Sequence, residues 1–385
     1  MQNFEFHNPT RILFGQGQIA ALARQVPAGA KVLMLYGGGS IKSNGVYDEV
    51  KAALSGHAVL EFGGIEPNPH FETLMQAVEL VRREQVGFLL AVGGGSVIDG
   101  TKFIAAAALY EGDAWDILSK GGKVIQAALP FGSVLTLPAT GSEMNSASVI
   151  TRHATQEKRG FMSRHVYPVF SVLDPAKTLT LPARQVGNGV VDAFVHVMEQ
   201  YLTYPAQAPV QDRYAEGLLL TLIEEGPQAL SRPDDLAVRA NVMWSATMAL
   251  NGLIGVGVPQ DWSTHMIGHE LTALYGLDHA QTLAVVLPGI MQVKRDAKRA
   301  KLLQYAERVW GLRDGDEGSR IDAAIAATRR FFEQMGVPTR LSAYGLDASA
   351  IDAAVNALET AGSVHLGEHH DIDGSATRAA LTLSL

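Results

Sequence analysis

Two short apolar runs, each ending in the same glycine-rich turn, most restrict what this chain can fold into. Lys31–Tyr36 (KVLMLY) leads into Gly37–Ser40, and Phe88–Val92 (FLLAV) leads into Gly93–Ser96. Between them, Phe71–Arg83 has its apolar residues at helical spacing. Because strands that alternate with helices need crossover connections, this pattern predicts a mostly parallel sheet with helices on both faces.

The second half of the chain has a different pattern. Two more strand-like runs, Ser133–Leu137 and Val169–Leu173, continue the α/β alternation, and long helical patterns take over after Pro182. These helical patterns cover Asn188–Leu202, Gln211–Leu230, Leu236–Leu250, Asp261–Tyr275 and Ile321–Met335. We therefore predict an α/β nucleotide-binding domain over residues 1–182 and an all-α domain over residues 183–385.

Composition narrows the chemistry. The 385 residues include 31 Lys+Arg and 39 Asp+Glu, a formal net charge of −8 at pH 7, which disfavours nucleic acid and anionic membranes as partners. There is no Cys, so the 12 His must supply any nitrogen ligand or proton relay. Neither uncharged stretch, 124–142 or 240–260, is a continuous apolar span of about 20 residues. With no signal peptide visible, we expect a cytoplasmic protein.

The second glycine turn suits phosphate binding. A strand that stops at Gly93–Ser96 before a helix directs bare N–H groups and the positive end of the helix dipole at one point. We expect Ser96 to cap this helix. The turn lacks the G-x-G-x-x-G fingerprint, so a strand-to-helix turn without a ligand is the alternative.

The first glycine turn bears on which nicotinamide cofactor binds. NAD sites place a carboxylate at the ribose 2′-hydroxyl, whereas a 2′-phosphate favours positive charge. Between Gly37 and Val46 there is no acid, but there are Ser40 and Lys42. If this turn faces the adenosine, NADP(H) is favoured over NAD(H); a purely structural turn remains the alternative.

A metal signal lies in the helical half. Asp192 and His196 are four residues apart on one helical face, as are His265 and His269, and His279 follows after a turn. Imidazole and carboxylate suit Fe²⁺ or Zn²⁺. Spacing alone does not select four ligands, and the candidates are Asp192, His196, Glu199, His265, His269, Glu270 and His279.

Four segments together resemble the iron-containing (group III) alcohol dehydrogenase family, in particular its NADPH-dependent aldehyde reductase and butanol dehydrogenase branch. They are GGGSVIDGTKFIAA, TLPATGSE, GNGVVDAFVHVMEQY and DWSTHMIGHELTALYGLDHAQ. The resemblance implies a dehydroquinate synthase-like architecture: an NADP(H)-binding α/β domain, a helical metal-binding domain and an active site in the cleft between them. It also implies metal-assisted hydride transfer to short- or medium-chain aldehydes.

The resemblance also assigns residues. It implies one divalent metal, iron or zinc, held by Asp192, His196, His265 and His279. It places His269 beside the nicotinamide, where this side chain either relays a proton or only packs. The implied cofactor contacts are Gly37, Gly38, Ser40, Gly94, Gly95, Ser96, Asp99, Thr136, Thr140, Asn145, Lys158 and Thr178.

Other functions on this plan remain open. A dehydroquinate synthase-like or glycerol-phosphate-dehydrogenase-like enzyme acts on a sugar or polyol phosphate and needs Lys or Arg near the metal, but Val190–Tyr201 and Asp261–Ala280 contain none. A non-catalytic nucleotide sensor would bind cofactor without turnover. We expect a homodimer paired through an N-terminal strand at Asn3–His7, and a solvated loop for the His-rich Gly367–Asp371.

Overall fold

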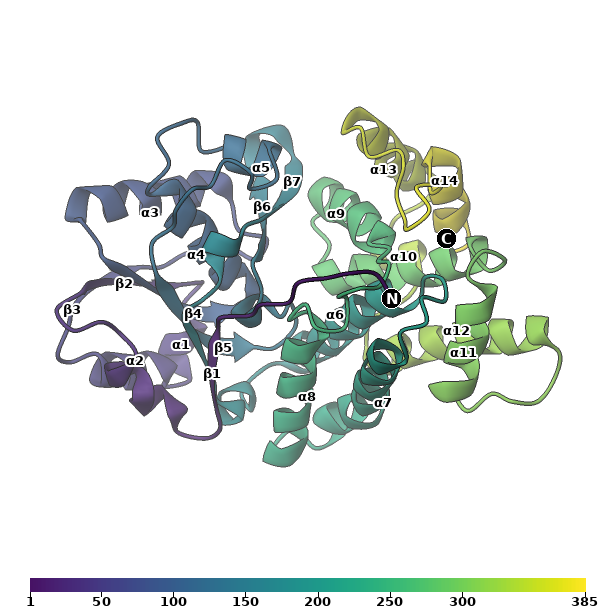
Figure 1. The fold of residues 1–385 in the computed structure, drawn as a ribbon, viewed down its shortest axis with the longest axis horizontal. Helices are drawn as coiled ribbons and strands as arrows, with labels where there is room; N and C mark the ends of the chain where they lie inside the picture. The colour runs from purple at the N-terminus through teal and green to yellow at the C-terminus, as the bar shows by residue number, and fades with distance from the viewer. The chain divides into compact units, whose positions relative to one another are not determined.

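The computed structural model describes residues 1–385, and internal contacts divide the chain into two compact units. The α/β unit comprises His7–Leu181 and Asp234–Thr247. The helical unit comprises Met1–Phe6, Pro182–Pro233 and Met248–Leu385. Figure 1 shows the strands gathered in the first unit and long helices in the second. Most of α8 (Leu236–Ala249), a helix from the second half of the sequence, therefore belongs to the α/β unit.

A six-stranded sheet forms the centre of the α/β unit. Its order is β1-β8-β5-β4-β2-β3, and every neighbouring pair is parallel. The predicted parallel sheet is thus confirmed. The strands are β1 (Arg11–Phe14), β2 (Lys31–Tyr36), β3 (Ala58–Phe62), β4 (Phe88–Gly94), β5 (Phe131–Leu137) and β8 (Phe170–Leu173), and β6 (Ala147–Arg152) and β7 (Glu157–Met162) form a separate antiparallel hairpin.

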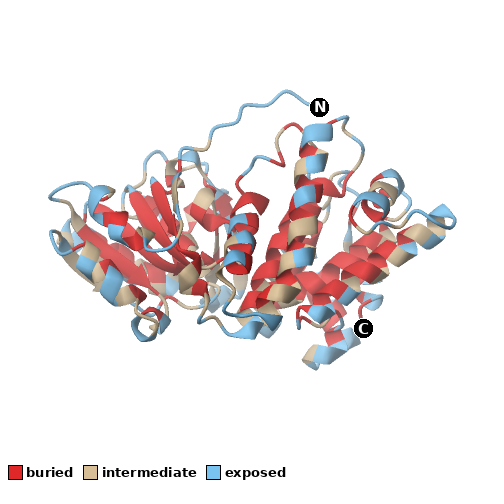
Figure 2. Cartoon of the chain, turned by 90° about the horizontal axis from the view of Figure 1, so that it is seen from below, coloured by how far each residue is buried: buried red, intermediate tan, exposed pale blue.

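Helices cover both faces of this sheet. Along β2, Leu33 and Leu35 pack in the cluster that includes residues of α3 and α4, whereas Val32 and Met34 pack with η1 and α2. Figure 2 shows the inner strands of the sheet largely in the red of buried residues, in keeping with the burial of β2, β4, β5 and β8. The remaining elements here are η1 (Gln18–Arg24), α1 (Ser40–Ser43), α2 (Val46–Ala53), α3 (Phe71–Glu84), α4 (Gly95–Ala107), α5 (Asp116–Ser119), η2 (Ser142–Met144), η3 (His153–Thr155), η4 (Arg164–Val166) and η5 (Pro175–Thr178).

The helical unit contains no strand. It is built around α6, whose residues from Gly189 to Tyr201 are all buried. Every helix in the chain is too short or too polar to cross a membrane. The helices after the sheet are α6 (Ala183–Tyr201), α7 (Pro209–Ser231), α8 (Leu236–Ala249), α9 (Ser263–Tyr275), α10 (His279–Val293), α11 (Arg299–Arg308), α12 (Glu317–Gln334), η6 (Leu341–Tyr344), α13 (Ala348–Thr360) and α14 (Gly374–Thr382).

The N-terminal segment differs from the prediction. No strand forms over Asn3–His7, and the chain first joins the sheet at Arg11. Instead, the N-terminal amino group donates to the carbonyl of Ala206 at 2.6 Å, and the N–H of Gln2 donates to that of Gly257 at 2.9 Å. The start of the chain thus finds hydrogen-bond acceptors in the helical unit's own loops.

A buried lysine ties α4 to the segment that follows β5. The Nζ of Lys102 donates to Ser142 Oγ at 2.8 Å, to Asn145 Oδ1 at 2.9 Å and to the carbonyl of Ala147 at 2.7 Å. Asp99, one helical turn earlier, accepts a hydrogen bond from the same Ser142 hydroxyl at 2.5 Å. Burial lowers the pKa of Lys102 to about 8, against the opposing charge of Asp99. This polar network fixes the turn after β5 against α4.

Replacing this lysine tests how much the network contributes. Lys102→Met leaves three acceptors without their donor and Asp99 without its counter-charge, so we expect unfolding free energy to fall by about 3 kcal/mol. Urea denaturation measures the loss. The control is Lys120→Met, which removes an exposed pair with Asp116 and is expected to cost less than about 1 kcal/mol. Equal losses for the two variants would contradict a stabilising role for the network.

Candidate functional site

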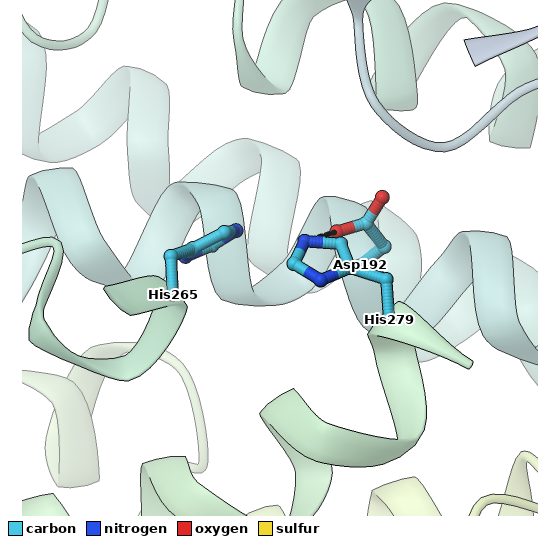
Figure 3. A group of neighbouring side chains, drawn as sticks. All are labelled: Asp192, His265 and His279. Carbon is cyan, nitrogen blue, oxygen red and sulfur yellow. Dashed lines mark ion pairs between the residues drawn. The ribbon is translucent and has the colours of Figure 1, made fainter. Parts of the chain in front are cut away.

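Three helices of the helical unit bring an acid and two histidines to one point. Asp192 lies in the middle of α6, His265 in the first turn of α9, and His279 is the first residue of α10. One potential ligand atom from each of the three lies within 4.8 Å of the others. Figure 3 shows the two imidazole rings and the carboxylate turned toward a common space.

His196 lies beside this group. Asp192 Oδ1 is 3.6 Å from the Nε2 of His196 and 3.7 Å from the Nε2 of His279. A tetrahedral metal with bonds of about 2.1 Å separates its ligand atoms by roughly 3.4 Å, so these spacings are close to those of a metal site. The ring of His196 stacks on that of His265 at 4.8 Å. The structure therefore gathers the four residues that the resemblance assigns as ligands.

The donor set and its burial fit a divalent transition metal. One carboxylate and three imidazoles are ligands that suit Fe²⁺ or Zn²⁺. Asp192, His196 and His265 are buried, and His196 Nδ1 has no hydrogen-bond partner. The other ring nitrogen of His196, Nε2, is the one that faces Asp192, at 3.6 Å, so Nε2 is the nitrogen placed for a metal.

Glu199 has a role that the spacing did not reveal. Its Oε1 accepts a hydrogen bond from the backbone N–H of His265 at 2.9 Å and lies 3.1 Å from His265 Nδ1. Burial, and then the charge of Asp261, raise the pKa of Glu199 well above its usual range. A carboxylate that holds Nδ1 makes Nε2 the nitrogen that could take a metal, and supporting carboxylates commonly orient metal ligands in this way. Its position seven residues after Asp192, on the same face of α6, was the available signal.

His269 and Trp262 flank the cluster. The ring centroid of His269 is 5.3 Å from that of His279 and 6.4 Å from that of His265, and His269 is half-buried. Trp262 precedes α9, and its ring centroid lies 5.2 Å from that of His265. Its backbone has a φ of 64°, in the left-handed region that residues other than glycine rarely adopt.

In the α/β unit, the predicted cofactor turns meet at one edge of the sheet. β2, β4 and β5 are neighbours in the sheet and run parallel, so their carboxyl ends lie together. Gly37–Ser40 follows β2, Gly94–Ser96 closes β4, and Thr136–Thr140 closes β5. The crevice outside the carboxyl ends of such strands is where open α/β sheets bind ligands.

The turn after β4 needs its glycines for close packing. A Cβ at Gly95 would lie 2.4 Å from Thr140 Oγ1, and one at Gly94 would lie 3.1 Å from the Cβ of Leu137. α4 begins at Gly95, with free N–H groups at its start that suit a phosphate. The predicted cap is wrong, because the N-cap is Gly94 and no side chain caps the helix. Instead, Ser96 Oγ accepts a hydrogen bond from the N–H of Asn68 at 3.3 Å.

The turn after β2 is open. A Cβ at Gly38 would meet nothing within 4 Å, so no neighbour in the chain requires glycine there. The Nζ of Lys42 lies 5.0 Å from the ring centroid of Tyr36 and 5.1 Å from that of Tyr47. Its hydrogen bond with Tyr36 raises the pKa of Lys42, which keeps this side chain cationic.

An acidic residue that the sequence pattern did not indicate lies near this turn. Glu61 on β3 accepts hydrogen bonds from the hydroxyl of Tyr47 at 2.7 Å and from Lys51 Nζ at 3.1 Å. Burial raises the pKa of Glu61, but these two hydrogen bonds and the charge of Lys51 lower it overall. The carboxylate is thus already engaged by partners on α2.

The remaining predicted cofactor contacts make hydrogen bonds within the protein. Asp99 and Asn145 belong to the Lys102 network, and Thr178 Oγ1 donates to the carbonyl of Pro175 at 2.7 Å. Lys158 Nζ donates to Asn68 Oδ1 at 2.9 Å. Asn68, which the sequence reading missed, therefore contacts both Ser96 and Lys158; its φ of 55° is the structural signature of its tight turn.

Comparison with known proteins gives consistent matches. Residues 9–175 match the family described as iron-containing alcohol dehydrogenase, and residues 187–366 match the C-terminal domain of the Fe-containing alcohol dehydrogenase family. The chain is 66% identical over 380 residues to the NADPH-dependent aldehyde reductase YqhD of Escherichia coli K12, covering 98% of each.

Two further matches extend the likeness. The chain is 43% identical over 360 residues to the probable NADH-dependent butanol dehydrogenase 1 of Bacillus subtilis, covering 91% of this chain and 92% of that one. The crystal structure of Escherichia coli K-12 YqhD superposes with a TM-score of 0.99 at 64% identity, covering 100% of this chain and 99% of that one. The predicted fold, an α/β domain followed by a helical one, is confirmed.

Removing one histidine tests the metal site. His265→Ala deletes one of the three converging side chains, so we expect affinity for Zn²⁺ to fall by more than the 10–100-fold typical of residues that only support a ligand. Elemental analysis after dialysis and calorimetric titration with Zn²⁺ measure this. His370→Ala, in the exposed His-rich segment, is the control and should bind metal as the parent does. The reverse result would move the site to that segment.

Proposed function

Because this chain belongs to the iron-containing alcohol dehydrogenase family, we propose that it is an NADPH-dependent aldehyde reductase, and in reverse an alcohol dehydrogenase, for short- or medium-chain aldehydes. The observation that carries the proposal is the convergence of Asp192, His265 and His279 from three helices. Lys and Arg are absent from 190–201 and 261–280, which supports a small neutral substrate over a phosphorylated one.

The residues that would hold the metal are Asp192, His196, His265 and His279, and the metal would be iron or zinc. When bound, the metal supplies a Lewis acid for the carbonyl group, and NADPH supplies the hydride. Glu199 holds the His265 ring in the orientation that this binding needs.

His269 and Trp262 act on the substrate side of this cluster in our proposal. His269 is a titratable group next to His279, one helical turn beyond His265, and it supplies or relays the proton that the product oxygen takes up. The half-buried indole of Trp262 covers His265 and excludes water from that side. The positions of the two rings, beside His265 and His279, support both roles.

The α/β unit would bind the cofactor at the carboxyl ends of β2, β4 and β5. We assign the pyrophosphate to Gly94, Gly95 and Ser96, and the adenosine end to Gly37, Gly38 and Ser40. Lys42 supplies positive charge for a 2′-phosphate, while Glu61 is engaged by Tyr47 and Lys51. The further contacts in this proposal are Asp99, Thr136, Thr140, Asn145, Lys158 and Thr178.

The finer properties of the enzyme are part of the same proposal. We propose that the enzyme is a cytoplasmic homodimer. We also propose that it uses NADPH to reduce aldehydes. β1 stands at the edge of the sheet, and Phe4 and Phe6, just before it in the sequence, are exposed. An unpaired strand edge preceded by apolar side chains suits pairing with a second copy of the chain.

An acid placed in the first glycine turn tests the cofactor assignment. The space around Gly38 accepts a side chain, and a carboxylate there would repel a 2′-phosphate and accept a hydrogen bond from a 2′-hydroxyl. We expect Gly38→Asp to shift the ratio of kcat/KM for NADPH and NADH at least about tenfold toward NADH, which is about 1.4 kcal/mol. Gly38→Ala is the control for added bulk, and an unchanged ratio in Gly38→Asp would discredit the assignment of this turn.

Metal removal tests the proposed reaction directly. We expect NADPH oxidation with butanal to be lost on chelation and restored by Fe²⁺ or Zn²⁺, because the three converging side chains and the adjacent His196 then regain their metal. The measurement is the fall in NADPH absorbance, with elemental analysis of each preparation. Turnover that is indifferent to chelation would exclude the metal role, and metal binding without turnover of any aldehyde would favour the dehydroquinate synthase-like enzyme or the nucleotide sensor.

A further inference from the structure

A single buried lysine, Lys298, joins three parts of the helical unit. Its Nζ donates to the carbonyl of Leu202 at 2.8 Å, to Asp261 Oδ2 at 2.9 Å and to Glu368 Oε1 at 2.6 Å. An ammonium group has three N–H donors, so all of them are engaged. The exposed fractions of the Lys298, Asp261 and Glu368 side chains are 1%, 5% and 2%. Burial opposes the charge of Lys298, but the two carboxylates outweigh it and raise its pKa.

Asp261 connects this lysine to the turn that precedes His265. While Oδ2 contacts Lys298, Oδ1 accepts a hydrogen bond from the N–H of Ser263 at 2.9 Å. The N–H of Asp261 in turn donates to the carbonyl of Glu199 at 2.8 Å. Ser263 is the first residue of α9, so Asp261 sets where this helix begins. His265 follows within the first helical turn.

The turn itself is strained and must be held. Trp262 sits between Asp261 and Ser263 with its backbone in the left-handed region, and such residues persist only where their surroundings over-determine them. On one side, the Trp262 indole N–H donates to Gln260 Oε1 at 2.7 Å, and Gln260 Nε2 donates to the carbonyl of Gly255. On the other side, the only cation that contacts Asp261 is Lys298.

Glu368 reaches Lys298 from the segment that the sequence predicts to be a solvated loop. An antiparallel bridge between Leu366 and Ile372 closes this loop. Asp371 pairs with Lys294 and its side chain stays 49% exposed, whereas the Glu368 side chain is 2% exposed. The prediction is wrong for Glu368, since the loop turns that one carboxylate inward to a buried cation.

We propose that Glu368 is a positioning residue for the metal site: through Lys298 and Asp261, it holds the first turn of α9 and so aims His265. This inference rests on the proposed function, which gives the site its metal. Glu368 lies more than 100 residues beyond His265 in the sequence, yet two side chains, Lys298 and Asp261, connect it to the start of the ligand's helix. It touches neither substrate nor cofactor in this role.

The test compares metal retention in three variants of the full-length protein. Glu368→Ala removes one acceptor of Lys298, and we expect about tenfold weaker Zn²⁺ affinity and faster loss of metal to a chelator. Glu368→Gln keeps an oxygen acceptor and should recover most of the affinity. NADPH binding, followed by its fluorescence, should be unchanged in both. The matched control is Asp371→Ala, which removes the other carboxylate of the loop and should retain metal as the parent does.

The outcomes separate this inference from the proposed function. If the parent protein depends on metal and Glu368→Ala retains Zn²⁺ as tightly as the parent, the positioning role is excluded while the proposed function stands. Equal losses in Glu368→Ala and Asp371→Ala would also exclude it, because the effect would then belong to the loop as a whole. A parent protein that binds no metal would overturn both. Should Glu368→Ala not fold, Glu368→Gln carries the test with an expected loss of about threefold.

Discussion

Buried carboxylates, and the need to balance their charge, organise the polar interior of this protein. Glu143 is buried in the α/β unit, and Asp192, Glu199 and Asp261 are buried in the helical unit. An ionised carboxylate removed from water is costly unless a cation or several hydrogen bonds face it. Each of these acids therefore needs a cation or hydrogen-bond donors packed against it. The helices and turns that carry those groups are held in place by these contacts.

The two units balance these charges in the same way. In the α/β unit, Lys102 supplies the cation near Asp99 and Glu143, and Thr247 donates a hydrogen bond to Glu143 at 2.6 Å. In the helical unit, Lys298 balances Asp261, and the backbone N–H of His265 is among the donors to Glu199. In both units a cation or a hydrogen-bond donor meets the buried charge.

Asp192 stands among histidine side chains. Its Oδ1 lies 3.6 Å from the Nε2 of His196 and 3.7 Å from the Nε2 of His279. Neutral imidazoles do not neutralise a carboxylate, whereas a divalent cation at their common focus would do so. The same charge rule that explains the lysines thus favours a metal among the histidines.

The sequence predicts features that follow from short-range periodicity and misses those that depend on distant partners. Buried strands such as β2 show as apolar runs, but β3, interrupted by Glu61 and only partly buried at the sheet edge, does not. Asp192 and His196 show because a helix repeats every 3.6 residues. Lys298 and Glu368 resemble ordinary surface charges in sequence, and only tertiary contact makes them a buried pair. Local sequence patterns therefore indicate the candidate ligands. Lys298 and Glu368, which we propose to position His265, are recognised only from their tertiary contacts.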